Sequence, residues 1–197
     1  IKLNLMEKLT GLKKIKTAVF ISGTGSNLKN LIKFSNVKKT PISINLVVSN
    51  TGKAKGLKYA DQFNIKKKKI NFQNIRSAEK KILLLLNKEK IGFICLAGFM
   101  RILSKDFIKK FDGKIINIHP SLLPKYKGLN THQRAITNKD KFTGCTVHYV
   151  TAKLDSGKII LQKKIKISLR DNLTSLSKKV LKLEHKLYPE AINKILN

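Results

Sequence analysis

Short apolar runs alternate with longer amphipathic stretches along the first two thirds of the chain. Runs of four to eight apolar residues are typical of buried strands, and apolar residues spaced by three or four positions are typical of helices. The expected strands cover residues 17–22, 42–49, 65–70, 92–97 and 114–118, and the expected helices cover residues 26–34, 54–63, 78–90 and 104–111. This order predicts an α/β fold, Rossmann-like, with a mostly parallel sheet flanked by helices on both faces.

The pattern changes after Pro120. A helix is expected at residues 131–137, two strands at 143–150 and 158–167, and a closing amphipathic helix at 172–196. We therefore expect a C-terminal antiparallel extension of the sheet. No internal repeat or linker rich in Pro or Gly interrupts the pattern, so we expect a single domain at residues 16–197, preceded by an N-terminal extension at residues 1–15 whose role stays open.

The first expected strand runs into Gly23-Thr24-Gly25-Ser26-Asn27, and a helix follows directly. Glycines let backbone N–H groups approach an anion closely, and the helix N-terminus adds a partial positive charge. Leu28 occupies the third glycine position of the dinucleotide fingerprint, and no Gly-Lys-Ser/Thr follows. The loop predicts a site for a monophosphate or another small anion; a plain strand–helix turn capped by Ser26 is the alternative.

Asn117, His119 and Pro120 form the most informative group of polar positions. Alternate residues of a strand share a face, so Asn117 and His119 point the same way, and Pro120 ends the strand after His119. Ligands of open α/β sheets bind at this edge. An imidazole can move protons there, and a carboxamide can stabilise an oxyanion. Asp155 is either an ordinary turn residue or a carboxylate that faces His119.

Charge is the most unusual property of the composition. The chain has 42 Lys and Arg against 11 Asp and Glu, a net charge of +31, which favours a nucleic-acid partner. However, 38 of these cations are Lys and only 4 are Arg, the residue that forks onto phosphates and guanines. The chain is also rich in Ile and Asn, whose codons, like those of Lys, are rich in A and T. Base composition is thus the favoured explanation, and we expect no specific nucleic-acid partner.

The chain contains no stretch that predicts a membrane span or a metal site. The longest apolar run, residues 91–100, is half a membrane span, and residues 1–14 lack the apolar core of a secretion signal. We expect a cytoplasmic protein without a membrane partner. Cys95 and Cys145 are expected to be buried free thiols, and the His spacing indicates no metal ligation.

Four segments resemble those of the glycinamide ribonucleotide transformylases, a family of folate-dependent formyl transferases. They are residues 21–27, 96–103, 117–128 and 154–157, and the Asn-x-His-Pro-Ser-Leu-Leu-Pro stretch in the third is the most specific. The family moves the formyl group of 10-formyltetrahydrofolate to the amine of 5'-phosphoribosylglycinamide in purine biosynthesis. The resemblance implies this activity, these two small-molecule partners, the formyltransferase fold and no metal.

The resemblance also implies roles for individual residues. The catalytic residues would be Asn117, His119 and Asp155, and the residues that bind phosphoribosylglycinamide would be Gly25, Ser26, Asn27 and Glu184. The folate would contact Arg76, Met100, Arg101, Ile102, Leu103, Asn117, Thr151 and Leu154. The chain departs from the family pattern at Thr24, Ser156 and Asn130; the last stands where a His is often seen, so a substrate contact there would be altered.

Three alternatives stay open. Methionyl-tRNA formyltransferase shares the fold, and a positively charged chain would suit its tRNA substrate. However, that enzyme normally carries a second C-terminal domain, and its loop differs from residues 125–132. Formyltetrahydrofolate hydrolase usually carries an extra N-terminal domain, for which residues 1–15 leave no room. A non-catalytic, basic nucleic-acid-binding module is the alternative from another class, although every catalytic position is filled. Both a monomer and a homodimer fit the sequence.

Overall fold

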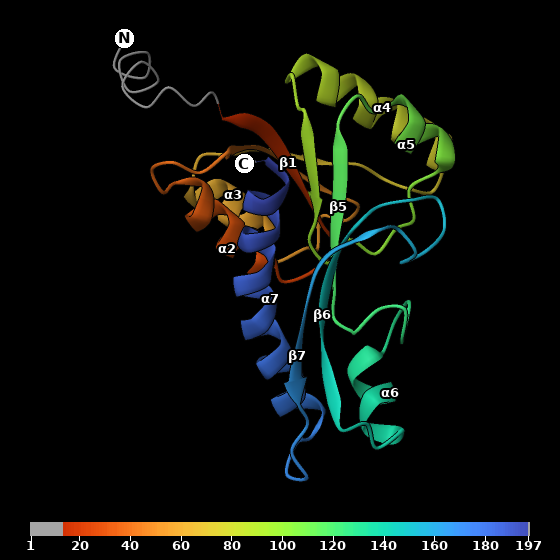
Figure 1. The fold of residues 1–197 in the computed structure, drawn as a ribbon. Coiled ribbons are helices and arrows are strands. Elements are labelled where there is room, and N and C mark those ends of the chain that lie inside the picture. The colour runs from red at the N-terminus through yellow and green to blue at the C-terminus, as the bar shows by residue number, and fades with distance from the viewer. Residues whose placement is uncertain (1–13, 197) are drawn as a thin grey trace.

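A seven-stranded sheet with helices on both faces organises the chain in a computed structural model that describes residues 14–196 (Figure 1). Most of the expected N-terminal extension lies outside these residues. The strand order is β3-β2-β1-β4-β5-β6-β7. The strands are β1 (Ile15–Ile21), β2 (Ile42–Ser49), β3 (Lys66–Lys69), β4 (Phe93–Leu96), β5 (Lys114–His119), β6 (Phe142–Tyr149) and β7 (Ile159–Lys166). The helices are α2 (Ser26–Ser35), α3 (Leu57–Gln62), α4 (Ile75–Lys88), α5 (Lys105–Lys110), α6 (Thr131–Thr137) and α7 (Leu173–Leu196).

The direction of the strands changes once. Strands β1 to β5 pair in parallel, and β6 and β7 then add in antiparallel order. The central strands are buried on both faces because helices cover the sheet from either side; Ala18 to Ile21 of β1 have no exposed surface. The prediction of a mostly parallel sheet with a C-terminal antiparallel extension is thus confirmed.

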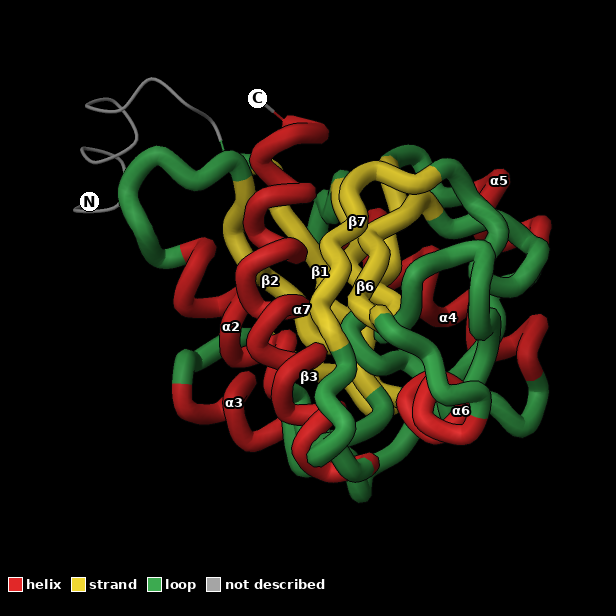
Figure 2. Tube along the Cα trace, turned by 60° about the horizontal axis from the view of Figure 1, so that its bottom comes forward, coloured by secondary structure: helices red, strands yellow, loops and turns green. Residues whose placement is uncertain are grey.

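Two apolar clusters hold the layers together. Helices α2, α3 and α7 pack on one face of the sheet, and α4 and α5 pack on the other (Figures 1 and 2). Tyr188 of α7 is fully buried, and its hydroxyl lies 2.9 Å from the carbonyl of Leu96 and 3.3 Å from that of Ile116. The long helix is therefore tied to β4 and β5, the two strands that lead into the candidate site.

The first residues of three elements, α4, α3 and β1, differ from the expected ones. Helix α4 begins at Ile75, three residues early, because the Asn74 side chain accepts a hydrogen bond from the Ser77 N–H at 2.9 Å. Helix α3 begins only at Leu57, three residues later than expected, and Gly56 before it packs backbone to backbone against the first loop. Strand β1 begins at Ile15, inside the expected extension.

Both cysteines are buried and free, as predicted. Burial raises the pKa of each thiol above its ordinary range. Among the helices of the described residues, none has the length and apolar character needed to cross a membrane.

Candidate active site

A cavity of about 960 Å³ lies at the carboxyl ends of β1, β4 and β5. In a parallel sheet these ends share one edge, so loops that are distant in sequence meet there. Six segments line the cavity: residues 23–27, 97–102, 117–120, 128–133, 154–155, and the face of α7 that includes Ser177, Lys178, Leu181 and Glu184.

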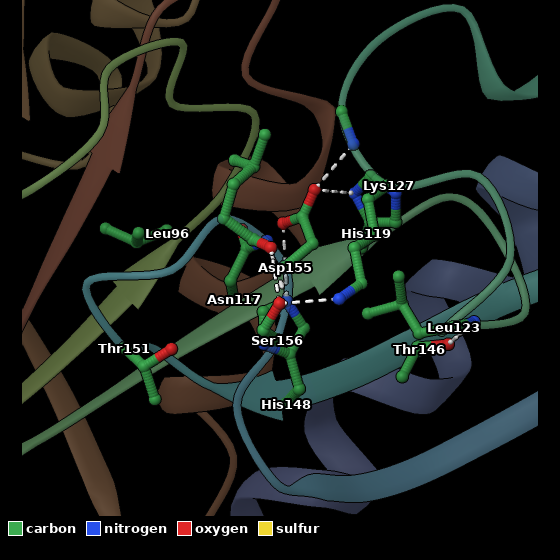
Figure 3. A network of polar contacts seen from close by, with 12 residues as sticks. Leu96, Asn117, His119, Leu123, Lys127, Thr146, His148, Thr151, Asp155 and Ser156 are labelled. Carbon is green, nitrogen blue, oxygen red and sulfur yellow. Dashed lines mark hydrogen bonds and ion pairs between the residues drawn. The ribbon is translucent and has the colours of Figure 1, made fainter.

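His119 is held at the end of β5 by two partners. Its Nε2 lies 2.8 Å from the carbonyl oxygen of Tyr126, and it must donate there because a carbonyl only accepts. Its Nδ1 lies 3.4 Å from Oδ2 of Asp155, which also accepts the Gly128 N–H at 2.8 Å (Figure 3). A protonated His119 thus has an acceptor for each ring N–H. Asp155 therefore faces His119, as the second interpretation of this residue expected.

The turn that carries Asp155 folds back on β6. Asp155 has a φ of +43°, a left-handed backbone conformation that is costly for a residue with a side chain. A Cβ at Gly157 would lie 1.7 Å from the carbonyl oxygen of Tyr149, so only glycine allows the turn to come this close. Lys127 Nζ donates to Ser156 Oγ at 2.6 Å and joins this turn to the segment after β5. Backbone strain and close packing together present the carboxylate to His119.

His148 completes the network from β6, in a supporting role. The antiparallel register places it opposite Asn117. Its Nδ1 donates to the Tyr149 carbonyl at 2.9 Å, so its Nε2 accepts from Asn117 Nδ2 at 3.2 Å. Burial lowers the pKa of His148, which favours this neutral form. His148 therefore sets the orientation of the Asn117 carboxamide and leaves its second N–H for a ligand. Only the β5–β6 register could have revealed this.

The first loop brings the N-terminus of α2 to the edge of the cavity. Gly25 precedes α2 with a φ of +75°, and a Cβ there would lie 2.5 Å from Cα of Gly56. No side chain caps α2, and its first turn holds no acidic residue, so its leading N–H groups have no side-chain acceptor. Ser26 is the first helical residue rather than the cap, so the cap expected at Ser26 in the alternative is wrong.

Asn27 connects this loop to α7. Its Nδ2 donates to Glu184 Oε2 at 2.7 Å, and both residues are buried and line the cavity. Burial raises the pKa of Glu184 to about 7, and the hydrogen bond from Asn27 opposes that rise. The four residues expected to bind phosphoribosylglycinamide, which include Gly25 and Ser26, thus lie together.

Apolar side chains surround the mouth of the cavity. Met100, Ile102, Leu129 and Leu154 are each 46–68% exposed and line it, and Arg101 lies among them. Leu129 is an addition to the expected set. Three expected folate contacts lie away from the wall: Arg76 on the exposed first turn of α4, Thr151 on an exposed loop, and Leu103, which is buried against α4 and α5.

His132 also lines the cavity, close to His119. Burial lowers its pKa, and the proximity of His119 lowers it further. Its Nδ1 has no hydrogen-bond partner within residues 14–196. Across the same residues, no group of three or more His, Cys, Asp or Glu side chains could hold a metal ion.

Comparison with known proteins gives a consistent result. The formyl transferase family model matches residues 15–192. The chain is 43% identical over 183 residues to the human trifunctional purine biosynthetic protein adenosine-3; the match covers 91% of this chain and 18% of that protein. It is 41% identical to the phosphoribosylglycinamide formyltransferase of Haemophilus influenzae, with 90% of this chain and 85% of that protein covered.

Solved structures give the same result. The phosphoribosylglycinamide formyltransferase of Brucella melitensis superposes with a TM-score of 0.89 at 41% identity, covering 93% of this chain and 96% of that one. The enzyme of the same name from Coxiella burnetii, solved in complex with CHES, has a TM-score of 0.87 at 40% identity, with 93% and 88% covered. Because the family model spans nearly all described residues and the fold agrees, this chain belongs to the formyl transferase family.

Proposed function

We propose that this chain transfers the formyl group of 10-formyltetrahydrofolate to the amine of 5'-phosphoribosylglycinamide, a step of purine biosynthesis. The carrying observation is that Asn117, His119 and Asp155 form one network between an uncapped anion-binding loop and an apolar rim, all in one cavity. One end of the cavity suits a phosphate, and the other suits a flat apolar ring.

The reaction needs an oxyanion stabilised and a proton moved. The folate supplies an activated formyl group, and the substrate amine attacks its carbon. The second N–H of Asn117, which His148 leaves free, stabilises the oxyanion that develops. The attacking nitrogen loses one proton and the leaving nitrogen gains one. His119, held between Asp155 and the Tyr126 carbonyl, provides the group that can carry both transfers.

The residues at the cavity mouth fit the folate. Met100, Ile102 and Leu154 offer exposed apolar surface for an aromatic ring system, and Arg101 offers a cation to a carboxylate. Arg76, Leu103 and Thr151 remain predicted folate contacts. To touch Arg76 or Thr151, the folate would have to extend beyond the cavity wall. Leu103 is buried and would act on the folate through the residues that cover it. The proposed partners are these two small molecules, with no specific nucleic acid, in a cytoplasmic monomer or homodimer.

One experiment separates this function from its rivals. Purified protein is given 10-formyltetrahydrofolate with either phosphoribosylglycinamide or methionyl-tRNA, and formylated product is measured in parallel. We expect formylation of the ribonucleotide alone. Formylation of the tRNA alone would overturn the substrate assignment, and release of formate with neither acceptor formylated would indicate a hydrolase.

A further inference from the structure

The β4–α5 connection, residues 97–104, has no regular secondary structure, although it forms part of the cavity mouth. Met100, Arg101 and Ile102 are exposed there and line the cavity. A connection of this kind is more mobile than the elements that it joins unless outside contacts hold its backbone. The position of these three side chains therefore depends on what holds the connection at its two ends.

Ser22 holds the first end. Its N–H donates to the Gly98 carbonyl at 3.0 Å, and its Oγ accepts the Met100 N–H at 2.8 Å. The same hydroxyl donates to Asn50 Oδ1 at 2.5 Å, so its own proton points away from Met100. Ser22 follows β1 directly and Asn50 follows β2 directly, so the backbone on both sides of Phe99 is tied to two strands of the sheet.

Glu79 of α4 holds the other end. It is 5% exposed, and its carboxylate oxygens accept the Ser104 N–H at 2.7 Å and the Ser104 hydroxyl. Ser104 Oγ accepts in turn the Phe107 N–H at 3.1 Å and caps the start of α5. No cation of residues 14–196 forms an ion pair with Glu79. The hydrogen bonds of this buried carboxylate thus fix the last residue of the connection.

Two apolar side chains attach the connection to the core between these ends. Phe99 packs edge-on against Phe20 and Phe72, with ring centroids 5.4 and 5.6 Å apart, and Leu103 is 2% exposed. Residues 100–102 are therefore a short exposed span between fixed points. A surface that is already ordered spares a ligand the entropy of ordering it, so these attachments favour binding at the mouth.

We propose that Ser22 and Glu79 are positioning residues that hold residues 100–102 in the geometry that binds the formyl donor. The identity of the donor rests on the proposed function, but the attachment of the connection does not. Both residues lie outside the cavity lining, so each acts through the connection rather than by touching a ligand. Loss of either should weaken donor binding and leave the ribonucleotide site and the chemical step unchanged.

The test compares two anchor variants, Glu79→Met and Ser22→Ala, with Glu79→Gln and the control Leu86→Val. Met has the length of Glu but removes both carboxylate acceptors, whereas Gln keeps an acceptor for the Ser104 N–H. Leu86 is buried on α4 about two turns from Glu79, so Leu86→Val removes core packing and leaves the carboxylate in place. Should Glu79→Met fail to fold, Ser22→Ala tests the same proposal from the other end.

The kinetic result should distinguish positioning from a general loss of stability. We expect KM for 10-formyltetrahydrofolate to rise about fivefold or more in both anchor variants, with kcat and KM for phosphoribosylglycinamide retained. Glu79→Gln and Leu86→Val should stay within about twofold of the parent. A parallel rise in both KM values would overturn the proposal, because the connection would then not be what the variants disturb.

A binding measurement separates this proposal from the proposed function, because it needs no formyl transfer. We expect calorimetric titration with tetrahydrofolate to give a Kd about fivefold or more higher in the anchor variants, with ribose 5-phosphate binding unchanged. If the parent binds tetrahydrofolate but formylates neither acceptor, the proposed function fails, while this selective loss still supports the positioning roles. No tetrahydrofolate binding by the parent, unchanged binding in either folded anchor variant, or an equal loss in Leu86→Val would each overturn them.

Discussion

Two histidines on neighbouring strands have different tasks because their hydrogen-bond partners differ. His148 donates to a carbonyl and accepts from Asn117, which requires the neutral ring. His119 donates to a carbonyl through Nε2, and its Nδ1 faces the Asp155 carboxylate instead of a side-chain amide. At the residue scale, the proposed roles therefore differ: His148 orients the Asn117 carboxamide, and His119 is the group proposed to move protons.

Removing either member of the His119–Asp155 pair should abolish most turnover. We expect His119→Ala and Asp155→Asn each to lower kcat by about a hundredfold or more, because the proposed proton transfer through His119 is lost or misdirected. The measurement is steady-state formyl transfer, with circular dichroism to verify folding. Near-normal turnover by a folded variant would contradict the proposed roles.

Glu184 makes the stability of the protein depend on pH. Burial raises its pKa to about 7 from an ordinary 4.5, so the folded state holds the proton more tightly than the unfolded chain does. The stability that this group contributes is complete below pH 4.5 and is lost as the pH rises through 7. Ionisation of this buried carboxyl group therefore lowers the free energy of unfolding as the pH rises through 7.

Glu184→Gln should therefore stabilise the protein above neutral pH. Gln keeps an acceptor for Asn27 and removes the charge, so we expect its unfolding free energy to exceed that of the parent by about 2–3 kcal/mol at pH 8 and to match it near pH 4.5. Urea denaturation at several pH values gives this difference. The exposed carboxylate Glu190 on the same helix supplies the control, Glu190→Gln. A difference that stays flat with pH would show that Glu184 ionises in the fold as it does in the unfolded chain.

At the scale of elements, the loops after β1 and β2 pack against each other at a contact between two glycines. Gly25 and Gly56 meet backbone to backbone, and a Cβ on either would lie 2.5–2.7 Å from the Cα of the other. The first loop is thus packed against the loop after β2, so its position depends on that neighbour as well as on its own sequence.

Gly25→Ala should damage both the loop and the fold. The positive φ costs about 1–2 kcal/mol and the close contact adds to it, so we expect a loss of about 2–4 kcal/mol in unfolding free energy and weaker ribonucleotide binding. Gly23→Ala is the matched control in the same loop, because a Cβ there has no atom within 4 Å. Thermal denaturation and KM would test both variants, and equal behaviour would show that the loop can shift without cost.

Most elements could be predicted from the sequence because they have their own apolar period, whereas β3, four exposed lysines, was located only by the apolar residues Ile65 and Ile70 that flank it. Strand β5 ends at His119 because Pro120 follows, and this also located Asn117 and His119 at the ligand edge. Leu103 was expected at the folate pocket, but the chain turns it into the core beside α5. Asn117 needs His148, and that pairing depends on strand register rather than on any local pattern.

At the scale of the whole molecule, the net charge of +31 is weakly compensated. The lysine ion pairs within residues 14–196 involve Asp61, Glu89, Asp140, Asp171 and Glu190, and they lie at the surface, where such pairs contribute little. Repulsion among the remaining lysines therefore opposes the compact state.

Salt should accordingly stabilise this protein. Screening shortens the Debye length from about 10 Å at 0.1 M to about 3 Å at 1 M, so we expect Tm to rise by about 3 °C or more across that range. Scanning calorimetry in sodium chloride, which does not resemble the substrate phosphate, measures the effect. A falling Tm would mean that attractive ion pairs outweigh the repulsion.

The two outer strands of the sheet give the excess of lysine a further consequence. Strand β3 consists of four exposed lysines, and β7 at the opposite edge carries Lys163, Lys164 and Lys166. An outer strand with free N–H and C=O groups invites another chain to add to it. Here any second molecule that approached edge to edge would bring lysines against lysines. We therefore expect these lysines to oppose edge-to-edge pairing of the sheets at high concentration, although their repulsion also opposes the compact state of each chain.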